Sequence, residues 1–322
     1  MDYFVYLNSK EISFSVDTSK TILDAALEKQ FHLGYSCKKG ECGSCSASLL
    51  SGSVKDKSGN IIDSGDILTC CSYPQSDIIL DLEYLPELKD IQVLNLPCKI
   101  TYLESLLDKF YILKVKLPPN SGFKFLPWQY VNLSLKGVSR SYSLASTDTT
   151  NNELEFHIKH VPNGLFSELL ASSEINQLMR LEGPLGSFFT RQNPAPIIFV
   201  AGGTGFAQIQ GMIQKLIQDG SNRLIYCYWR MKFSTDFYSS IPYSWTNKNI
   251  TFIPFVSNED INAKERKGDI DEILKEDFLN LKDFNVYVCG SLGLIQKTKK
   301  VCSDLGLDSK SFFTDAFVSS GA

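Results

Sequence analysis

Residues 35–45 read YSCKKGECGSC and place cysteines at positions 37, 42 and 45, a spacing of C-x4-C-x2-C. The N-terminal stretch MDYFVYLNSKEISFSV alternates apolar and polar residues and does not resemble a signal peptide. We therefore expect a cytoplasmic protein, in which nine cysteines are more often metal ligands, catalytic thiols or buried apolar side chains than disulfides. The clustered thiols predict a metal centre in this part of the chain.

The fourth thiol of such a centre has two candidates. Cys70 and Cys71 are adjacent in the segment ILTCCSYPQSD, and Cys70 lies 25 positions after Cys45. Two irons need four terminal thiolates, and this loop spacing with a distant fourth cysteine is typical of plant-type 2Fe–2S ferredoxins. Gly40 and Gly43 let the loop backbone approach the cluster and turn its N–H groups toward the sulfurs. A structural zinc ion is the alternative, although zinc sites usually pair two C-x2–4-C units.

Length and charge limit the classes of protein to which the chain can belong. With 322 residues it is long enough for two or three domains, each with its own core. Its net charge of −4 argues against a nucleic-acid partner, and no run approaches the roughly 18 apolar residues that a membrane helix needs. Residues 1–90 hold 8 basic and 14 acidic side chains, against 24 and 22 in residues 91–322. This acidic first part either docks on a basic partner or serves solubility.

Three blocks follow one another along the chain, and each has its own pattern. Residues 1–90 read as two strands, a helix, the cysteine loop and further strands, which predicts a small α+β module. Residues 91–193 contain short strands separated by turns, which is typical of an antiparallel barrel. Residues 194–322 alternate buried apolar strands with helices, which predicts a parallel α/β sheet.

The second block contains three segments that suit a flavin nucleotide. RSYSLAS, residues 140–146, sets an arginine beside an aromatic residue, so that a guanidinium can pair with phosphate while a ring covers a flat heterocycle. IKHVPNGLFSELL, residues 158–170, runs from a strand into a helix that opens with G-x-x-S, and N–H groups at a helix start bind pyrophosphate. EGPLGSFF, residues 182–189, then gives a glycine–proline turn.

The third block carries two segments that suit a nicotinamide nucleotide. FVAGGTGFAQIQGMI, residues 199–213, puts a glycine-rich turn between a buried strand and a helix, which allows close approach of a dinucleotide. It is not the Rossmann fingerprint, because Gln208 stands where the third glycine would be. VYVCGS, residues 286–291, brings Cys289 to the end of a later strand. Arg230 ends the strand that would otherwise carry an acid, and could pair with the 2′-phosphate of NADPH.

In this order, the segments of the second and third blocks resemble the ferredoxin–NADP reductase superfamily. The resemblance implies FAD and a nicotinamide cofactor, and we expect NADH rather than NADPH because Arg230 lacks supporting Ser or Arg neighbours. It also implies that Arg140 binds flavin phosphate, that Tyr142 packs on the isoalloxazine and that Ser143 lies near its N5. The implied FAD-binding residues are Arg140, Tyr142, Ser143, Lys159, Gly164 and Ser167.

For the nicotinamide, the resemblance implies that Cys289 lies beside the reactive carbon. It also implies that the near-terminal Phe317 shields the flavin, although the three phenylalanines of SFFTDAF could equally be core residues. Cys289, Ser143 and Phe317 are thus the catalytic candidates. Two positions depart from the superfamily pattern, since Trp128 replaces a glycine and Gln208 replaces a proline. The implied nucleotide-binding residues are Gly202, Gly203, Thr204, Gly205, Gly290 and Ser291.

The segment TCCSYPQSD resembles the closing segment of plant-type ferredoxins, in which the cysteine directly after Thr is a ligand. This resemblance favours Cys70 over Cys71 and implies a β-grasp fold for residues 1–90. The implied cluster ligands are Cys37, Cys42, Cys45 and Cys70.

Nearly the whole chain resembles the CDP-6-deoxy-Δ3,4-glucoseen reductases of 3,6-dideoxyhexose synthesis, through GYSCKKGECGSC, RSYSLAS, LEGPLGSFF, VAGGTGFA and FFTDAF. The resemblance implies that electrons pass from NADH through FAD and a 2Fe–2S cluster to a partner protein, a dehydratase that carries pyridoxamine phosphate. A flavin takes up a hydride and releases single electrons, so it has to stand between the other two centres. Two alternatives stay open: the reductase of an oxygenase system, and a ferredoxin-like electron carrier without NADH activity.

Overall fold

The computed structural model describes residues 2–8, 12–127, 129–148, 150–245, 249–257 and 263–317. Trp128, one of the two departures from the superfamily pattern, lies outside these residues. No helix within the described ranges is long and apolar enough to cross a membrane. The chain divides into two compact units: Met1–Ile91 with Gly186–Phe188 and Thr314–Val318, and Gln92–Leu185 with Phe189–Phe313 and Ser319–Ala322.

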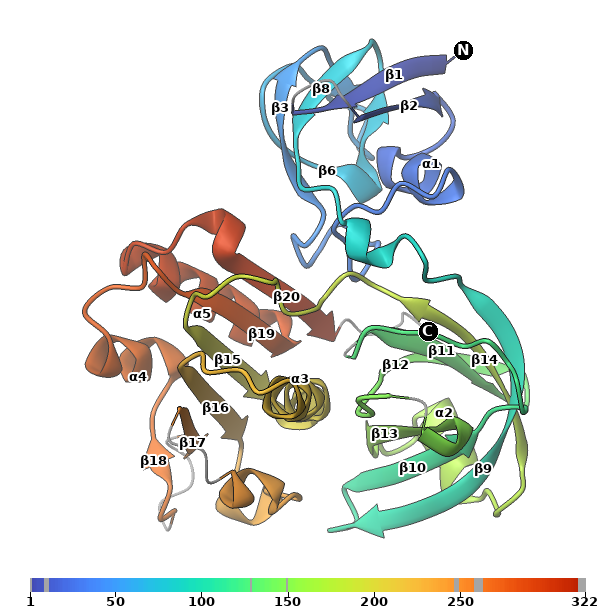
Figure 1. The fold of residues 1–322 in the computed structure, drawn as a ribbon, viewed down its shortest axis with the longest axis vertical. Coiled ribbons are helices and arrows are strands. Elements are labelled where there is room, and N and C mark those ends of the chain that lie inside the picture. Colours follow the sequence, from blue (N-terminus) through green and yellow to red (C-terminus); the bar gives the residue numbers. More distant parts are fainter. Residues whose placement is uncertain are drawn as a thin grey trace. The chain divides into compact units, whose positions relative to one another are not determined.

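The first unit is a mixed sheet with one helix, drawn mainly in blue and cyan in Figure 1. Its strand order is β2-β1-β8-β3-β6, in which β1 pairs antiparallel with β2 and parallel with β8. A second, small sheet has the order β5-β4-β7. The predicted α+β, β-grasp module is confirmed. The bounds are β1 Asp2–Leu7, β2 Ile12–Asp17, α1 Ile22–Glu28, β3 Ser46–Ser51, β4 Val54–Lys55, β5 Ile61–Ile62, β6 Gly65–Leu68, β7 Tyr73–Pro74 and β8 Ile78–Asp81.

The core of the first unit follows from alternation along its strands. Val5 and Leu7 of β1, and Phe14 and Val16 of β2, are two positions apart and almost fully buried, because successive strand side chains point to opposite faces. Helix α1 begins after Thr21, whose Oγ1 accepts a hydrogen bond from the first turn. Two cysteines of the predicted metal centre, at positions 45 and 70, belong to the same core. The core therefore fixes one side of the cysteine loop.

The second unit contains a six-stranded antiparallel sheet in the order β12-β11-β14-β9-β10-β13. Its end strands β12 and β13 contact each other, so the sheet curls into the barrel visible in Figure 1. Leu113, Val131 and Leu181 are fully buried inside it. The predicted antiparallel barrel is confirmed. The bounds are β9 Leu94–Leu106, β10 Phe110–Lys116, β11 Tyr130–Leu135, β12 Val138–Ser143, β13 Glu153–Lys159, α2 Leu165–Ala171 and β14 Leu178–Leu185.

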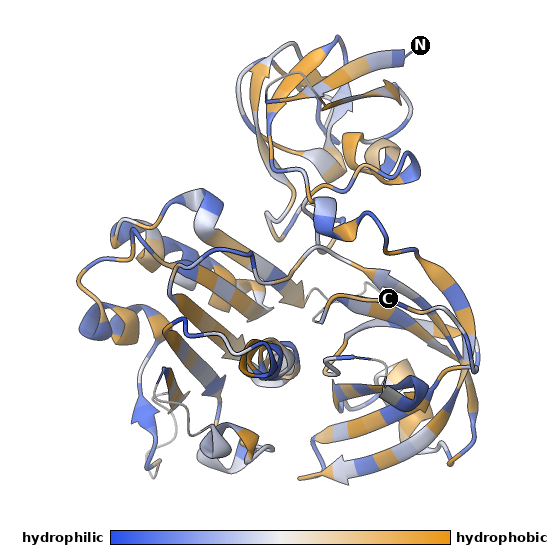
Figure 2. Cartoon of the chain, viewed as in Figure 1, coloured by the Kyte–Doolittle hydropathy of each residue, from blue (hydrophilic) through white to orange (hydrophobic). Residues whose placement is uncertain are grey.

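The remaining sheet has the order β18-β17-β16-β15-β19-β20, with β15 parallel to both β16 and β19. It belongs to the second unit except for residues 314–317 of β20, which are assigned to the first. Strand β15 is hydrophobic and buried, whereas the edge strand β18 is hydrophilic (Figure 2). The predicted parallel α/β sheet is confirmed. The bounds are β15 Ile197–Gly202, α3 Phe206–Gln218, β16 Ile225–Met231, β17 Ile250–Val256, β18 Arg266–Lys267, α4 Ile270–Asp277, β19 Asn285–Ser291, α5 Leu292–Asp304 and β20 Phe312–Phe317.

Short 3-10 helices occur between these elements, and two of them lie at predicted sites. One contains both adjacent cysteines, and the other contains most of the glycine loop. Their bounds are Thr69–Cys71, Pro86–Leu88, Thr150–Asn152, Gly203–Gly205, Ser234–Asp236, Ile241–Ser244 and Ser309–Ser311.

Within the second unit, the barrel and the parallel sheet pack against each other. The Nδ1 atom of His157 on β13 and the hydroxyl of Tyr238 are 3.1 Å apart. Helix α3 approaches the segment RSYSLAS so closely that a Cβ on Gly211 would lie 3.1 Å from the carbonyl oxygen of Ala145. The predicted flavin segment therefore borders the helix that follows the predicted nicotinamide loop.

Candidate functional site

Two pairs of cysteine side chains meet at the cysteine loop of the first unit. The Sγ atoms of Cys45 and Cys70 lie 3.2 Å apart, and the side chains of Cys37 and Cys42 are hydrogen-bond partners. Cys37 is partly exposed, whereas the other three are buried. The hydrogen bond from Cys42, aided by backbone N–H groups such as that of Lys39, lowers the pKa of Cys37, and the same bond raises the pKa of Cys42. The loop thus stabilises the thiolate form, which binds metals, at Cys37.

This arrangement suits two irons better than one zinc ion. A zinc site gathers four ligands around one point. Among the residues that the structure describes, no three His, Cys, Asp or Glu side chains form a group that could hold a metal ion in this way. Two pairs of thiols, each able to hold one iron, are what a 2Fe–2S cluster with four cysteine ligands requires.

The second of the adjacent cysteines, Cys71, lies against Gly40 of the loop. The Sγ atom of Cys71 lies 3.4 Å from that of Cys70, and the Lys57 side chain hydrogen-bonds to Cys71. Burial raises the pKa of the Cys71 thiol. Gly40 has a φ of +81°, and a Cβ there would lie 2.6 Å from Cys71 Sγ. Glycine at position 40 therefore permits both the turn and the close contact with this thiol.

Hydrogen bonds from two distant segments hold both flanks of the cysteine loop inside the first unit. The Tyr35 N–H donates to Ser187 Oγ at 2.6 Å, and Ser36 Oγ donates to Asp315 Oδ1 at 2.5 Å. Ser44 Oγ donates to the backbone carbonyl of the residue before Asp315 at 2.8 Å. These residues lie within segments that the sequence analysis quotes, but the segments carried no sign of their pairing, because each bond joins positions 152 to 279 apart.

The predicted flavin-binding residues lie on neighbouring elements of the barrel. Arg140, Tyr142 and Ser143 belong to β12, and the ring of Tyr142 packs at 5.0 Å between centroids against that of Phe166 on α2. Arg140 is half-buried, and its Nη1 donates to the carbonyl of Ser139 at 2.7 Å. Burial raises the pKa of Tyr142 above its ordinary value of 10.0.

The turn into helix α2 holds the remaining flavin candidates. Gly164 is the N-cap residue, and a Cβ on it would lie 2.9 Å from both Ser167 Oγ and the Val161 carbonyl oxygen. Ser167 Oγ donates to that carbonyl at 2.7 Å, so this hydroxyl closes the turn. Lys159 ends β13 and is exposed. Backbone N–H groups at the start of α2 are the donors suited to a pyrophosphate here.

The glycine loop meets the end of β19 at the carboxyl edge of the parallel sheet, where open α/β sheets bind their ligands. A Cβ on Gly205 would lie 2.5 Å from the Cys289 carbonyl oxygen, and a Cβ on Gly290 would lie 3.2 Å from Gly202 Cα. Only glycine allows backbone segments to approach this closely. The fold thus brings together both nucleotide segments predicted from the sequence, Gly202, Gly203, Thr204 and Gly205 with Cys289, Gly290 and Ser291.

The thiol of Cys289 contacts Gln208. Both side chains are fully buried, and Cys289 Sγ donates to Gln208 Oε1. From the sequence, Gln208 was only a departure from the superfamily pattern. Its partner lies 81 positions away, so spacing alone carried no sign of this contact.

A charged cluster lies at the same edge of the sheet, beyond β16. Arg230 Nη2 and Asp269 Oδ1 are 3.9 Å apart, and Lys297 of α5 donates to the other oxygen of the same carboxylate. That hydrogen bond raises the pKa of Lys297. Asp269 is also the N-cap of α4 and forms a capping box with Glu272. One carboxylate therefore stands between two cations.

The structure distinguishes two phenylalanines of the last strand. The partly buried ring of Phe313 stacks on that of Tyr287 with centroids 4.7 Å apart. Phe317 ends β20, and 41% of its surface is exposed. Phe317 is therefore the more accessible of the two to a bound cofactor.

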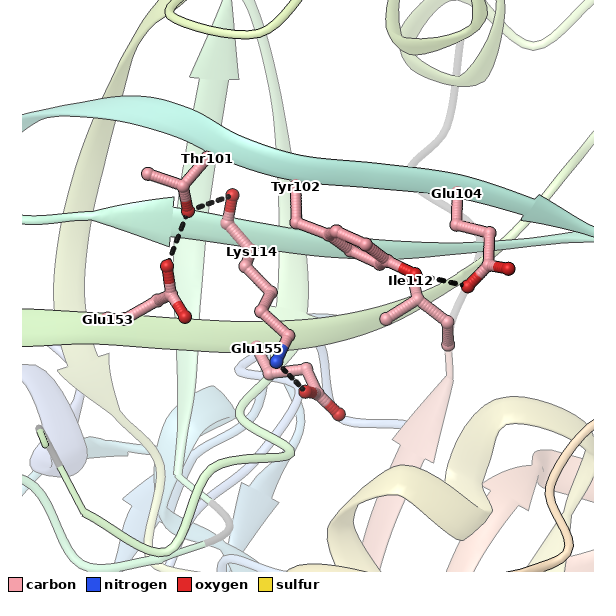
Figure 3. A pocket seen from close by; sticks show the side chains of 7 residues that line it. All are labelled: Thr101, Tyr102, Glu104, Ile112, Lys114, Glu153 and Glu155. Atoms are coloured by element: carbon pink, nitrogen blue, oxygen red, sulfur yellow. Dashed lines mark hydrogen bonds and ion pairs between the residues drawn. The ribbon is translucent and has the colours of Figure 1, made fainter.

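A polar cavity of about 520 Å³ lies on the barrel wall over β9, β10 and β13, as Figure 3 shows. Lys114 Nζ pairs with Glu155 Oε2 at 3.2 Å, and His157 Nε2 lies 2.9 Å from Glu155 Oε1. The hydrogen bond with His157 lowers the pKa of Glu155. The cavity is lined by Thr101, Tyr102, Glu104, Ile112, Lys114, Glu153 and Glu155, which come from outside the predicted cofactor residues.

Three families match successive parts of the chain. Residues 5–75 match the 2Fe-2S iron-sulfur cluster binding domain, residues 97–189 the oxidoreductase FAD-binding domain and residues 199–300 the oxidoreductase NAD-binding domain. Protein RfbI of Salmonella typhimurium is 42% identical, over 99% of this chain and 98% of the relative. The CDP-6-deoxy-L-threo-D-glycero-4-hexulose-3-dehydrase reductase of Yersinia pestis is 41% identical, over 99% of this chain and 100% of the relative. The chain belongs to the CDP-6-deoxy-Δ3,4-glucoseen reductase family.

As a member of this family, the protein is an NAD(P)H-dependent oxidoreductase with a 2Fe–2S cluster, FAD and NAD(H) as its cofactors. The reductase component 1 of terephthalate 1,2-dioxygenase from a Comamonas species is a more distant relative, 30% identical over 99% of this chain and 98% of the relative. A cytochrome P450 reductase of Amycolatopsis has the same fold, with a TM-score of 0.74 and 20% identity over 99% of this chain and all of that one. Proteins of this kind pass electrons to a separate partner protein.

Proposed function

We propose that this reductase passes electrons from NADH to a CDP-sugar dehydratase that carries pyridoxamine phosphate, and so completes a deoxygenation step in CDP-3,6-dideoxyhexose synthesis. The observation that carries this proposal is the 41% identity, end to end, with the Yersinia pestis relative that bears the name of such a reductase. The three domain matches supply the three centres in the required order, since only the flavin exchanges both hydrides and single electrons.

For the cluster, we propose that four thiolates hold the irons as two pairs. The 3.2 Å approach of Cys45 and Cys70, and the hydrogen-bonded pair of Cys37 and Cys42, support this assignment. Cys71 instead hydrogen-bonds to the Lys57 side chain. The proposed ligands are Cys37, Cys42, Cys45 and Cys70.

For the nucleotides, we propose that the chain binds, orients and shields rather than exchanges protons. The start of α2 holds pyrophosphate, the glycine loop admits the dinucleotide, and Cys289 orients the nicotinamide. Tyr142 and Ser143 contact the isoalloxazine, and Phe317 covers its face. The proposed nucleotide-binding residues are Arg140, Tyr142, Ser143, Lys159, Gly164, Ser167, Gly202, Gly203, Thr204, Gly205, Gly290 and Ser291.

We also propose NADH as the preferred reductant. The pairing of Arg230 with Asp269 supports this preference, because a guanidinium beside a carboxylate is poorly disposed to attract a 2′-phosphate. We place the protein in the cytoplasm, where its thiols stay reduced. We propose module boundaries after residues 90 and 193, which the matched ranges support.

The 30% identity with a dioxygenase reductase component supports one alternative function, in which the partner is an oxygenase. A coupled assay separates the two. The purified protein, loaded with FAD and cluster, is incubated anaerobically with NADH, a pyridoxamine-phosphate CDP-sugar dehydratase and a CDP-6-deoxy-4-hexulose. We expect loss of the sugar's 3-hydroxyl only when both proteins are present, and none with Cys37→Ser. Bleaching of flavin and cluster by NADH without any deoxygenation would overturn the assignment of the partner.

A further inference from the structure

We infer that the exposed edge of the cysteine loop is a basic docking surface for an acceptor protein that presents carboxylates beside its own redox group. This inference rests on the proposed function and specifies the chemistry of the partner. The surface consists of the side chains of Lys38, Lys39 and Lys57, which we call the lysine rim.

Contacts within the folded loop, and not sequence proximity alone, bring the lysine rim around the thiols. Lys57 Nζ donates to the backbone carbonyl of Lys39 at 3.4 Å, and the same side chain hydrogen-bonds to Cys71. Lys38 Nζ lies 4.9 Å from the centroid of the Tyr35 ring, and such a cation–π contact orients its ammonium group. All three lysines are exposed.

The local charge is opposite in sign to the average of the first block. Residues 35–57 carry four lysines against two acidic side chains, whereas the rest of residues 1–90 carries four lysines against twelve acids. Of those two local acids, Asp56 is engaged with Asn60, accepting hydrogen bonds at 2.8 and 2.9 Å. Glu41 is the other. A partner that approaches this loop meets an excess of positive charge within a mainly acidic module.

The exposed ligand marks where an acceptor comes closest. Among the four proposed ligands, Cys37 is partly exposed and the other three are buried. Lys38 and Lys39 follow Cys37 directly in the chain. An acceptor that reaches the cluster at Cys37 therefore contacts the rim, and complementary charge raises association rates by about 10- to 1,000-fold.

Two small acceptors of opposite charge test the sign of this surface without a partner protein. Hexacyanoferrate(III) is an anion, and hexaammineruthenium(III) is a cation. The holoprotein is reduced anaerobically with NADH and mixed with each acceptor, and reoxidation is followed at the cluster absorbance band as salt is raised. We expect the rate with the anion to fall with ionic strength and the rate with the cation to rise.

A matched pair of single charge reversals locates the effect. Lys39→Glu changes a residue of the lysine rim. Lys29→Glu makes the same change outside the rim, at a lysine that contacts Ser15 on the edge strand β2. We expect Lys39→Glu to slow the anion reaction about tenfold and to abolish its salt dependence, and Lys29→Glu to leave both unchanged. The EPR signal of the reduced cluster reports whether each variant still holds its irons.

The outcomes separate this inference from the proposed function. Rapid bleaching by NADH with a salt dependence of the opposite sign, or equal effects of the rim and control reversals, would overturn the lysine rim alone. Failure of NADH to bleach flavin and cluster in the unaltered protein would overturn the proposed function.

Discussion

The Sγ atoms of Cys45 and Cys70 lie 3.2 Å apart, although 25 residues separate the two cysteines in the chain. One belongs to the cysteine loop, and the other to the 3-10 helix Thr69–Cys71. The Thr69 N–H donates to the Cys45 carbonyl at 3.0 Å and fixes the two segments against each other. The pairing of these thiols is therefore set by backbone hydrogen bonds as well as by the spacing of the cysteines.

This geometry predicts different results for the two adjacent cysteines. We expect Cys70→Ser to lose most of its iron and the cluster EPR signal, because a neutral hydroxyl replaces one of four thiolates. We expect Cys71→Ser to keep about the normal iron content, since Cys71 hydrogen-bonds to Lys57 and is not one of the four proposed ligands. Iron and sulfide analysis of both variants, purified anaerobically, is the measurement. Equal iron loss in the two variants would refute the assignment of Cys70.

Gly40 and Gly43 predict a graded effect of adding a methyl group. Both have positive φ, +81° and +77°, but a Cβ on Gly40 would lie 2.6 Å from Cys71 Sγ while nothing lies within 4 Å of one on Gly43. In the cluster-free protein, we expect Gly43→Ala to cost about 1–2 kcal/mol of backbone strain and Gly40→Ala to cost more. Thermal unfolding of the apoproteins measures both. The double variant Gly40→Ala, Cys71→Ala should be more stable than Gly40→Ala alone, because it removes the sulfur that the added methyl group contacts.

The sequence predicted the three modules and the places of their motifs because each rests on local pattern. Alternation in β1 and β2, the apolar run of β15 and the glycines of the nucleotide loop are all visible within a few residues. Contacts such as Ser36 with Asp315 and Cys289 with Gln208 were not predictable in this way. They join residues of different motifs that only the fold brings together, and no motif shows which residue its side chains contact.

The charge of residues 1–90 shows a second limit of prediction from the sequence, which concerns local surface charge. Its acidic composition predicted either solubility or docking on a basic partner, since composition averages over the whole surface. Only the folded loop shows that Lys57, more than ten positions away, joins Lys39 beside the thiols. A local surface can therefore have the opposite sign to the module that carries it.

Glu155 predicts an acid-dependent stability of the barrel. The hydrogen bond with His157 lowers the pKa of Glu155 in the folded protein below its unfolded value of about 4.5. The stabilisation is therefore complete above about pH 4.5 and is lost as the pH falls through the folded-state pKa. We expect Glu155→Gln to lower the melting temperature at pH 7 by an amount worth about 1 kcal/mol and to have a smaller effect near pH 4. The exposed Glu104→Gln serves as the control, and a pH-independent difference for Glu155→Gln would contradict the linkage.

Asp269 predicts a change in the choice of reductant. In the native protein its carboxylate lies 3.9 Å from Arg230 and also accepts from Lys297, so both cations are partly neutralised. Asp269→Asn removes the negative charge but retains an N-cap side chain for α4, because asparagine caps helices about as well as aspartate. We expect the ratio of kcat/KM for NADPH to that for NADH to rise about tenfold, which corresponds to about 1.4 kcal/mol.

The matched control for this change is the double variant Asp269→Asn, Arg230→Ala. If Arg230 is the group that attracts a 2′-phosphate, removing it should bring the NADPH-to-NADH ratio of kcat/KM back to near the native value. The double variant Asp269→Asn, Lys297→Ala should lower this ratio by a smaller amount. The ratios are measured by steady-state reduction of an artificial acceptor at fixed low ionic strength, since exposed charges are screened within about 10 Å at 0.1 M salt. An unchanged ratio in Asp269→Asn would show that the adenosine end of the nucleotide lies away from this cluster, and the preference for NADH would then need another cause.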